Sequence, residues 1–313
     1  MALKNDVLYA LLEADGYISG EDLAKRFDKS RAAVWKAVRA LKRDGYDIDA
    51  VTNRGYMLTD SNGRISVESI KSKLKSDIDV LYYPKIDSTN NECKRLLANS
   101  KEGVFLVAAD EQTAGRGRQG KNFYSPALTG VYFSIVIKPK TSLQNAVTAT
   151  TAAAVAVCKA IEALTELNPK IKWVNDVYLN GKKICGILTE AITNFEEGTV
   201  ESVIIGIGIN ISTLEFPDDV ENAGCLGTKI SRSALIAEIT NELLKIAGGD
   251  YKSFIDYYRS RSFVIGERIK FIQSSKVTEA TAIAIDETGG LEVLLDNGEK
   301  TVLRSGEISV RRV

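Results

Sequence analysis

The stretch with the clearest chemical potential is GRGRQG, residues 115–120, which follows the apolar run VFLVAA. Its three glycines loosen the backbone and allow N–H groups to converge on an anion as a nest. Arg116 and Arg118 add permanent positive charges that can bind a phosphate or a carboxylate through two hydrogen bonds. We therefore predict a mobile cationic loop that closes over a phosphate-bearing compound and excludes water. A contact with RNA and a simple solvated turn are the alternatives, and the spacing fits neither a P-loop nor a dinucleotide-binding fingerprint.

Two later stretches carry further charged side chains. KWVND, residues 172–176, places Lys172 and Asp176 on one short segment. The Asn-Gly pair that begins NGKKICG at residue 180 is a strong hairpin signal. Lys183 follows that turn and leads a strand, in which Gly186 permits the close approach of a ligand.

DSTN, residues 87–90, precedes the helical pattern NECKRLL. Ser88, Thr89 and Asn90 are residue types that cap helices, because their side-chain oxygens accept hydrogen bonds from free backbone N–H groups. Capping alone explains them. Hydroxyl groups at a helix start can also present donors to a small polar ligand, so both interpretations stand.

The composition limits the chemistry that such a site can perform. The 313 residues include no histidine, which excludes Ser-His-Asp and Cys-His catalysis and zinc enzymes that use histidine. Four widely spaced cysteines without a CxxC pair argue against a zinc site or a disulfide framework and fit a reducing cytoplasm. We expect no secretory signal and no run that approaches a membrane span. The 41 basic and 41 acidic residues cancel, so the net charge indicates no partner.

The first 60 residues alternate short helical patterns with turn signals. We expect three helices, of which the first ends at Gly16, the second is capped by Ser19, and the third runs from about Ser30 to Gly45. The second and third form a helix-turn-helix, and a hairpin around NRG forms a wing. The apolar residues that these helices carry are Val7, Leu8, Leu11, Leu12, Leu23, Ala24, Phe27, Val34, Trp35, Val38 and Leu41.

Charge supports a DNA-binding interpretation of this region. Residues 25–43 contain eight basic residues and one acidic residue, which gives a net charge of +7. A recognition helix uses such a stripe to hold phosphates while its first turn contacts base edges. The alternative is a solvated helix face. We predict DNA contacts from Ser30, Arg31, Lys36 and Arg39.

The remaining chain alternates strands and helices, which predicts a mixed α/β (α+β) architecture. Residues 61–75 are expected to form a polar linker with a short helix. Strands are expected at 103–110, 130–139 and 199–212, a strand-turn-strand unit at 170–193, and helices at 143–167 and 231–259. The inner face of the first of these helices is expected to carry Val147, Val155, Cys158, Ile161 and Leu164. The predicted domains are a winged helix-turn-helix at 1–62, a central mixed-sheet domain with helices at 63–262, and a small SH3-like β-barrel at 263–313.

These motifs together resemble one family, the biotin–protein ligases, in particular the bacterial bifunctional form that is also the biotin operon repressor. The resemblance covers essentially the whole chain. It depends on the winged helix-turn-helix, the small C-terminal barrel and four stretches of sequence: DSTN at 87–90, EQTAGRGRQG at 111–120, KWVNDVYL at 172–179 and GKKICGILTE at 181–190.

The resemblance implies the reaction and its residues. Biotin and ATP, with Mg²⁺, would give biotinyl-5′-adenylate, and biotin would then pass to a lysine of the biotin carboxyl carrier protein of acetyl-CoA carboxylase. The implied biotin-binding residues are Ser88, Thr89, Asn90, Gln112, Gly115, Arg116, Gly117, Arg118, Lys183 and Gly186. The implied adenylate-binding residues are Arg116, Arg118, Phe123, Lys172, Asn175, Asp176 and Asn210. Catalysis is assigned to Arg118, Lys183 and Asp176, and Asp176 is also the implied Mg²⁺ ligand.

Two positions depart from the family pattern. Val174 stands where the family usually has proline, and Phe123 stands where some relatives have tryptophan. A phenylalanine still stacks on adenine, although with less area, so we expect a normal fold and weaker retention of the adenylate. The resemblance also implies that the adenylate-bound protein dimerises and binds operator DNA, with the strand VIIGIGIN and the ligand loops as the coupling element.

Two other functions remain open from the sequence. A lipoate-type adenylating ligase would use a similar sheet and a similar anhydride, although the full GRGRQG string and the winged helix favour biotin. A ligand-responsive regulator without catalysis would have little use for Arg116, Arg118 and Lys183 together. We expect a cytoplasmic protein with no membrane association.

Overall fold

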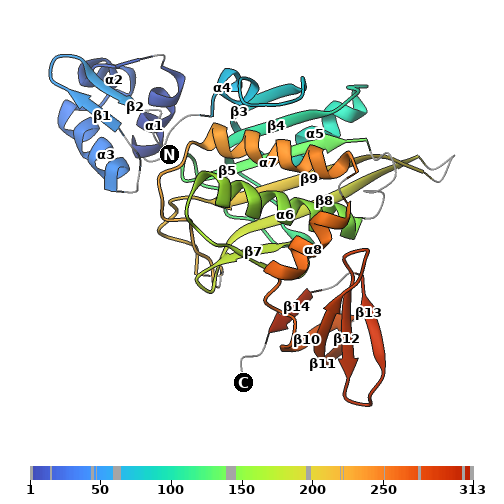
Figure 1. The fold of residues 1–313 in the computed structure, drawn as a ribbon. Helices are drawn as coiled ribbons and strands as arrows, with labels where there is room; N and C mark the ends of the chain where they lie inside the picture. Colours follow the sequence, from blue (N-terminus) through green and yellow to red (C-terminus); the bar gives the residue numbers. More distant parts are fainter. Residues whose placement is uncertain are drawn as a thin grey trace.

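The structure is a computed structural model that describes residues 3–14, 16–43, 46, 48–58, 65–138, 146–194, 199–218, 220, 222–249, 251–273, 276–304 and 307–310. Figure 1 shows a small N-terminal domain, a central domain built around a seven-stranded sheet, and a C-terminal five-stranded sheet. This arrangement confirms the predicted fold class. The domain boundaries stay predictions, and the first of them falls outside the described residues.

The N-terminal domain is a helix-turn-helix followed by a hairpin. It comprises α1 (Leu3–Glu13), α2 (Gly20–Arg26), α3 (Arg31–Arg43), β1 (Ile48–Val51) and β2 (Gly55–Leu58). Ser19 caps α2 as predicted, because its side chain accepts a hydrogen bond from Asp22 N. Trp35 is 47% exposed and does not join the apolar face of α3. The predicted end at Gly45 and the side chain of Leu12 lie outside the described residues.

The short helix predicted within residues 61–75 is present, but the segment from Ile65 onward is packed on the central domain and is not a free polar linker. Helix α4 (Val67–Lys71) buries Ile70 in the core of the central domain, and Ile65 is also buried there. Ser66 N donates to Ser233 Oγ over 3.0 Å, which ties this segment to α7 (Arg232–Ala247). The sequence therefore predicted the helix, and what it did not show is the burial of Ile65 and Ile70 against the central domain.

The central sheet is predominantly antiparallel. Its strand order is β3 (Asp79–Ile86), β4 (Phe105–Gln112), β5 (Gly130–Ile137), β9 (Thr199–Asn210), β8 (Lys182–Asn194), β7 (Asp176–Leu179) and β6 (Lys170–Lys172). Only the β3–β4 pair is parallel. The strands predicted at 103–110, 130–139 and 199–212 are therefore present, although residue 139 lies outside the described part of the chain.

The two faces of the sheet carry different helices. Helices α6 (Ala146–Leu164), α7 (Arg232–Ala247) and α8 (Tyr251–Arg261) belong to the large apolar core on one face, where Figure 1 shows α6 and α7 lying across the strands. Helix α5 (Thr89–Ala98) packs on the other face. Successive residues of a strand point to opposite faces. In β9, Ile205 and Ile207 enter the large core, so Gly206 and Gly208 face the α5 side.

Two predictions about the helices are wrong. Leu164 is 39% exposed and does not belong to the inner face of α6. The helix predicted from Ser231 to Arg259 is two helices, since Gly248 and Gly249 interrupt it and Gly249 has a φ of 128°. Residues 147–164 of α6 are long and apolar enough to cross a membrane, but 78% of these residues are buried inside the structure, as in the core helix of a folded domain. Residues 143–145 of the predicted helix lie outside the described residues.

The 170–193 segment has one more strand than predicted. Residues Trp173–Asn175 make a tight turn between β6 and β7, in addition to the predicted turn at Asn180 and Gly181. The C-terminal sheet consists of β10 (Arg268–Gln273), β11 (Lys276–Ile285), β12 (Leu291–Leu295), β13 (Lys300–Leu303) and β14 (Glu307–Val310). Its order is β13-β12-β11-β10-β14, and all of its pairs are antiparallel.

The N-terminal domain contacts the central domain beside the predicted site. Tyr46 donates its hydroxyl to Ala127 O over 2.6 Å, and Lys85 Nζ donates to the Tyr9 hydroxyl over 3.0 Å. Ala127 and Leu128 are part of the apolar core of the N-terminal domain. The segment that leads from the GRGRQG loop into β5 is therefore packed against the helix-turn-helix.

Candidate functional site

Three glycines leave one area of the central sheet without side chains. Gly186 of β8 lies opposite Gly208 of β9, and Gly206 lies two residues before Gly208 on the same face. A Cβ atom on Gly206 would lie 2.1 Å from Asn90 Oδ1, and one on Gly208 would lie 2.4 Å from the Phe123 ring. The backbone here must therefore stay bare. We call this area the glycine floor.

The strand register brings several predicted residues to this floor. Lys172 of β6 pairs with Asp176 of β7, Asp176 pairs with Gly186 of β8, and Gly186 pairs with Gly208 of β9. Side chains of directly opposed residues lie on the same face of an antiparallel sheet. One row across four strands thus gathers a lysine, an aspartate and two glycines that are far apart in the sequence.

A buried polar network borders the floor on the side of α5. Gln112 Oε1 accepts hydrogen bonds from Thr89 N (2.9 Å) and from Thr89 Oγ1 (3.1 Å). Ser134 donates to Thr89 Oγ1 over 2.7 Å and is within 2.6 Å of Asn90 Oδ1. Asn90 Nδ2 donates to Glu190 Oε2 over 2.8 Å. Thr89, Asn90 and Gln112 are thus brought together as predicted.

An ion pair between Lys94 and Glu190 lies at the end of this network. Lys94 Nζ lies 2.7 Å from Glu190 Oε1. Burial raises the pKa of Glu190, but hydrogen bonds from Lys94 and Asn90 outweigh burial and lower the pKa overall. Glu190 is therefore a carboxylate at neutral pH and holds the amide of Asn90 in one orientation.

Capping by the DSTN side chains is only partly as predicted. Ser88 occupies the N-cap position of α5 and is 2% exposed, but its side chain makes no capping hydrogen bond. The hydroxyl of Thr89 is engaged by Gln112 and Ser134 instead. The carboxylate of Asp87 accepts hydrogen bonds from Arg95 and Asn91, and the Arg95 guanidinium holds the pKa of Asp87 well below its usual range.

The GRGRQG segment folds as a narrow hairpin with the single turn η1 (Arg118–Gly120) at its tip. Phe123 N donates to Gly115 O over 2.9 Å, and Gly117 N donates to Lys121 O over 2.7 Å. The predicted nest is therefore wrong for Gly117, because its N–H group is used inside the loop. Gly115 is required for packing, since a Cβ atom there would lie 2.4 Å from Phe123 O.

The two arginines of the loop point to different neighbours. Arg118 donates to Asn175 Oδ1 over 3.2 Å, which joins the loop to the Trp173–Asn175 turn. Arg116 is exposed and donates to Asn91 Oδ1 over 3.4 Å. The structure thus brings Arg118 to the predicted adenylate side, while Arg116 lies over the start of α5.

Lys183 and Asp176 form the charged centre of the site. Lys183 Nζ lies 2.6 Å from Asp176 Oδ1, an ion pair that lacks the angles of a hydrogen bond. Lys183 Cε would be 3.5 Å from a Cβ atom on Gly186, so the lysine stem lies along the floor. Lys172 lies over the Tyr178 ring, 5.9 Å from its centroid.

Phe123 and Asn210 occupy the other side of the floor. The Phe123 ring covers Gly186 and Gly208 and meets the Tyr132 ring edge to face, with 6.4 Å between centroids. Asn210 is 5% exposed, and its Nδ2 donates to Gly224 O over 3.0 Å. Asn210 Oδ1 is buried without a hydrogen-bond partner among the described residues. An aromatic face and an unsatisfied amide oxygen suit an aromatic base that carries an amino group.

Sequence reasoning missed four residues that shape the site. Gly206 and Gly208 were visible as GIG at alternating positions of a strand, which places both on one face. Ser134 and Glu190 carried no local signal, because their partners lie on α5. Val174, which departs from the family pattern, is buried in the turn. Gly206, Gly208, Ser134 and Glu190 reach the site through the register of β5, β8 and β9 rather than through any one motif.

The residues fit a magnesium ion that arrives with its substrate. Mg²⁺ is commonly held by one or two carboxylates together with phosphate oxygens and water. Within the described part of the chain, no group of three or more Asp, Glu, Cys or His side chains gathers as a metal cage. Asp176 supplies one carboxylate, whose Oδ1 is paired with Lys183 and makes no hydrogen bond among the described residues.

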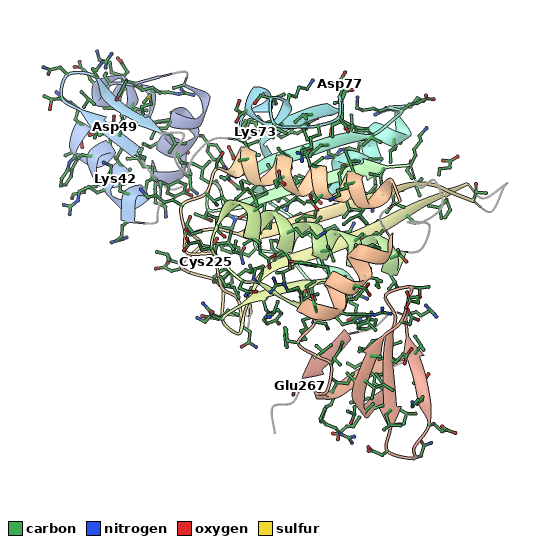
Figure 2. The ribbon with its side chains drawn as sticks, viewed as in Figure 1. Lys42, Asp49, Lys73, Asp77, Cys225 and Glu267 are labelled. Atoms are coloured by element: carbon green, nitrogen blue, oxygen red, sulfur yellow. The ribbon has the colours of Figure 1, made fainter. Side chains whose placement is uncertain are left out.

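The predicted DNA-binding residues lie on or just before α3. Arg31, Lys36 and Arg39 are exposed, whereas Ser30 caps the helix, since its Oγ accepts a hydrogen bond from Ala33 N over 3.2 Å. Arg39 stacks on the exposed Trp35 ring at 4.8 Å. Figure 2 shows Lys42 on this domain, well away from Glu267, which precedes β10. The basic face is therefore available to a duplex.

Comparisons with known proteins agree with the three parts of the fold. The family described as "Biotin/lipoate A/B protein ligase family" matches residues 82–210, "HTH domain" matches 4–57, and "Biotin protein ligase C terminal domain" matches 264–311. The bifunctional ligase/repressor BirA of Bacillus spizizenii is 33% identical over 96% of both chains. That of Escherichia coli is 29% identical over 97% of this chain and 96% of the relative. The biotin protein ligase of Aquifex aeolicus, solved with biotin and ATP, is 29% identical with a TM-score of 0.63 and covers 75% of this chain and 99% of its own.

The fold and the site thus define a ligase domain joined to a helix-turn-helix. The chain belongs to the family of bifunctional ligase/repressor proteins of the biotin–protein ligase type. This confirms the predicted family and the prediction of an ATP-dependent ligase, and it argues against a regulator without catalysis.

Proposed function

We propose that the chain joins biotin to ATP, forming biotinyl-5′-adenylate and pyrophosphate, and then transfers biotin to a lysine of a carboxylase carrier domain. The observation that carries this proposal is the row of Lys172, Asp176 and Gly186 beside Lys183 and Arg118. It puts fixed cations beside a strand surface with no side chains of its own, on which a flat ligand can lie once the Phe123 ring moves aside. The activity belongs in the cytoplasm, where the free cysteines of the chain stay reduced.

Biotin would bind across the glycine floor. Its ring system needs an apolar surface at van der Waals distance and polar groups at one end. Gly206 and Gly208 give the first, and Thr89, Gln112 and Ser134 of the buried network give the second. A ligand that meets such a prepared network finds donors and acceptors whose orientation costs no further entropy.

The adenylation step brings two anions together. The biotin carboxylate oxygen attacks the α-phosphorus of ATP, the bond to the β-phosphate oxygen breaks, and pyrophosphate leaves. Lys183 and Arg118 would reduce the repulsion and stabilise the charge that develops on the phosphate. Mg²⁺, held by Asp176 and phosphate oxygens, would supply further positive charge. Asn175, Phe123, Lys172 and Asn210 would hold the adenylate, and Gly115 to Arg118 would cover the anhydride.

The transfer step needs an uncharged amine. The carrier lysine attacks the acyl carbon of the mixed anhydride, its nitrogen loses a proton, and AMP leaves. Asp176 is the carboxylate nearest to Lys183 and is our candidate for orienting that amine. The GRGRQG hairpin would meanwhile exclude water, which competes with the amine for the anhydride.

Repression would follow from the same adenylate. We propose that the adenylate-bound chain forms a homodimer that binds operator DNA through Arg31, Lys36 and Arg39, with Ser30 as the helix cap. The contact of Tyr46 with Ala127 places the DNA-binding domain on the segment that follows Phe123. The strand at 203–210 and the loops around it are the proposed coupling element. Equal sedimentation with and without biotin and ATP would refute ligand-driven dimerisation.

One experiment tests the enzymatic proposal. The protein is incubated with ATP, an acetyl-CoA carboxylase carrier domain and either biotin or lipoate, and the carrier is weighed by mass spectrometry. We expect a biotin mass gain on the carrier, none with lipoate, and loss of the gain in Lys183→Ala and Arg118→Ala. Gly16→Ala is the control for an unrelated surface change, since no atom lies within 4 Å of its Cβ position. A gain only with lipoate, or no pyrophosphate release with biotin, would reject the proposal.

A further inference from the structure

The turn at residues Trp173–Asn175 is held from two sides. It carries Asn175, the partner of Arg118, and it leads directly into Asp176. On one side Asn175 Nδ2 donates to Ile187 O over 3.1 Å, and Ile187 N donates to Asn175 O over 3.0 Å. Strand β8 therefore fixes the inner end of this turn.

The C-terminal sheet holds the outer end. Trp173 is 3% exposed, and its indole N–H donates to Gly289 O over 2.9 Å. Gly289 belongs to the turn at residues 286–290 between β11 and β12. Thr148 of α6 donates to Thr288 O over 3.2 Å, and a Cβ atom on Gly289 would lie 3.0 Å from Thr151. The turn is thus seated between α6 and the indole.

The 286–290 turn is itself tightly bonded. Asp286 Oδ1 accepts hydrogen bonds from Thr288 N (2.7 Å), Thr288 Oγ1 (2.8 Å) and Gly290 N (2.8 Å). Burial raises the pKa of Asp286, but the bonds from Thr288 and Gly290 outweigh burial and lower it, with help from Arg304. The turn therefore keeps its shape at neutral pH and presents Gly289 O at a fixed point.

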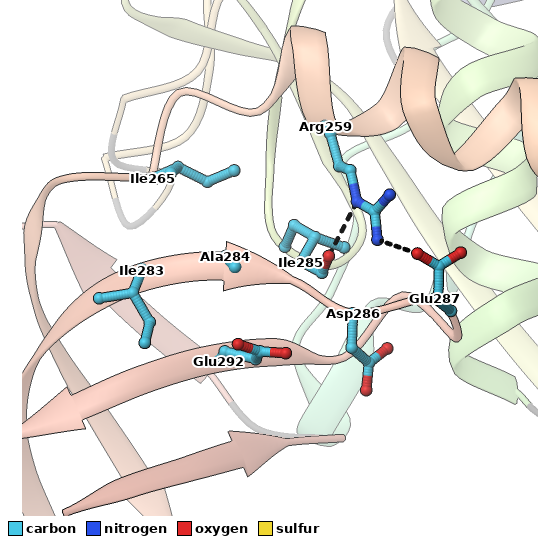
Figure 3. A pocket seen from close by; sticks show the side chains of 8 residues that line it. All are labelled: Arg259, Ile265, Ile283, Ala284, Ile285, Asp286, Glu287 and Glu292. Atoms are coloured by element: carbon cyan, nitrogen blue, oxygen red, sulfur yellow. Dashed lines mark hydrogen bonds and ion pairs between the residues drawn. The ribbon is translucent and has the colours of Figure 1, made fainter.

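Helix α8 fixes the base of the same turn. Figure 3 shows Arg259 donating to Ile285 O and paired with Glu287, with Nε 2.9 Å from the carbonyl oxygen. An open pocket of about 550 Å³ lies beside these contacts and is lined by Arg259, Ile283 and Glu292. At this place the C-terminal sheet therefore meets the central domain through its turn and not through a continuous surface.

We propose that the 286–290 turn is a positioning element of the ligase site, which holds the Trp173–Asn175 turn so that Asn175 and Asp176 face the nucleotide. The inference rests on the proposed nucleotide role of those two residues. A buried indole N–H that loses its acceptor must find another or move. Displacement of a catalytic segment by about 1 Å can cost about 100-fold in rate.

The test compares two glycines of the C-terminal sheet. Gly289 and Gly298 have φ values of 85° and 86°, so an alanine strains either turn equally. Only the Cβ at residue 289 meets the central domain; no atom lies within 4 Å of that at residue 298. Trp173→Phe removes the N–H and keeps an aromatic ring. For each variant, biotin-dependent ATP–pyrophosphate exchange is measured against ATP and against biotin, together with Tm.

We expect Gly289→Ala and Trp173→Phe to lower kcat/KM for ATP by about 10- to 100-fold, with the KM for biotin unchanged. That split arises because the Thr89–Gln112–Ser134 network lies on other elements. Gly298→Ala should lower Tm through the same backbone strain, by no more than Gly289→Ala does, and keep wild-type kinetics. Kinetics of Gly289→Ala and Trp173→Phe within twofold of Gly298→Ala would overturn the inference, and so would equal losses for ATP and biotin. Absence of biotin-dependent exchange in the wild type would instead overturn the proposed function.

Discussion

A single methyl group on the glycine floor is expected to break the buried hydrogen bonds that Asn90 makes beside it. In Gly206→Ala the new Cβ would lie 2.1 Å from Asn90 Oδ1 and 2.9 Å from Asn90 Cγ, so the whole amide must move. Asn90 then loses the hydrogen bond with Ser134 and the one to Glu190. A neutral hydrogen bond contributes about 1 kcal/mol and one to a charged group about 1.5–3 kcal/mol, which gives a loss of about 3 kcal/mol. For a domain of this size we expect Tm to fall by about 6–12 °C.

The assay pairs thermal unfolding with titration of biotin. Biotin affinity should fall as well, because Ser134 also orients Thr89. Gly16→Ala is the control, since nothing lies within 4 Å of its Cβ position. A double-mutant cycle isolates the contact: in an Asn90→Ala background, Gly206→Ala should cost little. If Gly206→Ala melts within 2 °C of the wild type and binds biotin normally, the floor and the network are not coupled as described.

Two further predictions concern pH and DNA. The pKa of Glu190 in the folded protein is lowered from 4.5, so its contribution to stability is complete above that value and is lost as the pH falls through the lowered pKa. Between pH 7 and pH 3, the Tm of Glu190→Gln should therefore fall less than the Tm of the wild type. Parallel curves of Tm against pH would contradict this. Trp35 is 47% exposed beside Arg39, whereas Trp173 is buried. Operator DNA should therefore change the tryptophan fluorescence of the wild type and leave the fluorescence of Trp35→Phe unchanged. A DNA response that survives in Trp35→Phe would place the duplex away from this face of α3.

The sequence was sufficient for the elements that carry local signals. Ser19 and the Asn180-Gly181 turn were predictable because capping and left-handed turns depend on neighbouring residues. The Gly248-Gly249 break had an equally local signal, and the prediction of one long helix from Ser231 ignored it. Trp35 and Leu164 were grouped with apolar faces by residue type, although a hydrophobic side chain at the edge of a helical stripe is often exposed.

The site itself could be predicted only as separate motifs. Arg118 and Asn175 are 57 positions apart, and nothing in their spacing gives the 3.2 Å contact between them. Glu190 and Ser134 become polar partners of Asn90 only because β8 and β5 flank β9 in the sheet. Sheet order is a long-range property, since it depends on which strands pair, and local periodicity cannot supply it.

The internal bonds of the GRGRQG hairpin change how its closure must be understood. Two backbone hydrogen bonds, from Phe123 to Gly115 and from Gly117 to Lys121, tie its strands together. A loop bonded in this way moves as a unit rather than residue by residue. Because Phe123 covers the floor while Arg118 reaches Asn175, any displacement that lifts the ring also moves the guanidinium. Entry of a ligand onto the floor would therefore release Arg118 from Asn175 at the same time, which would link the proposed biotin site to the proposed nucleotide site.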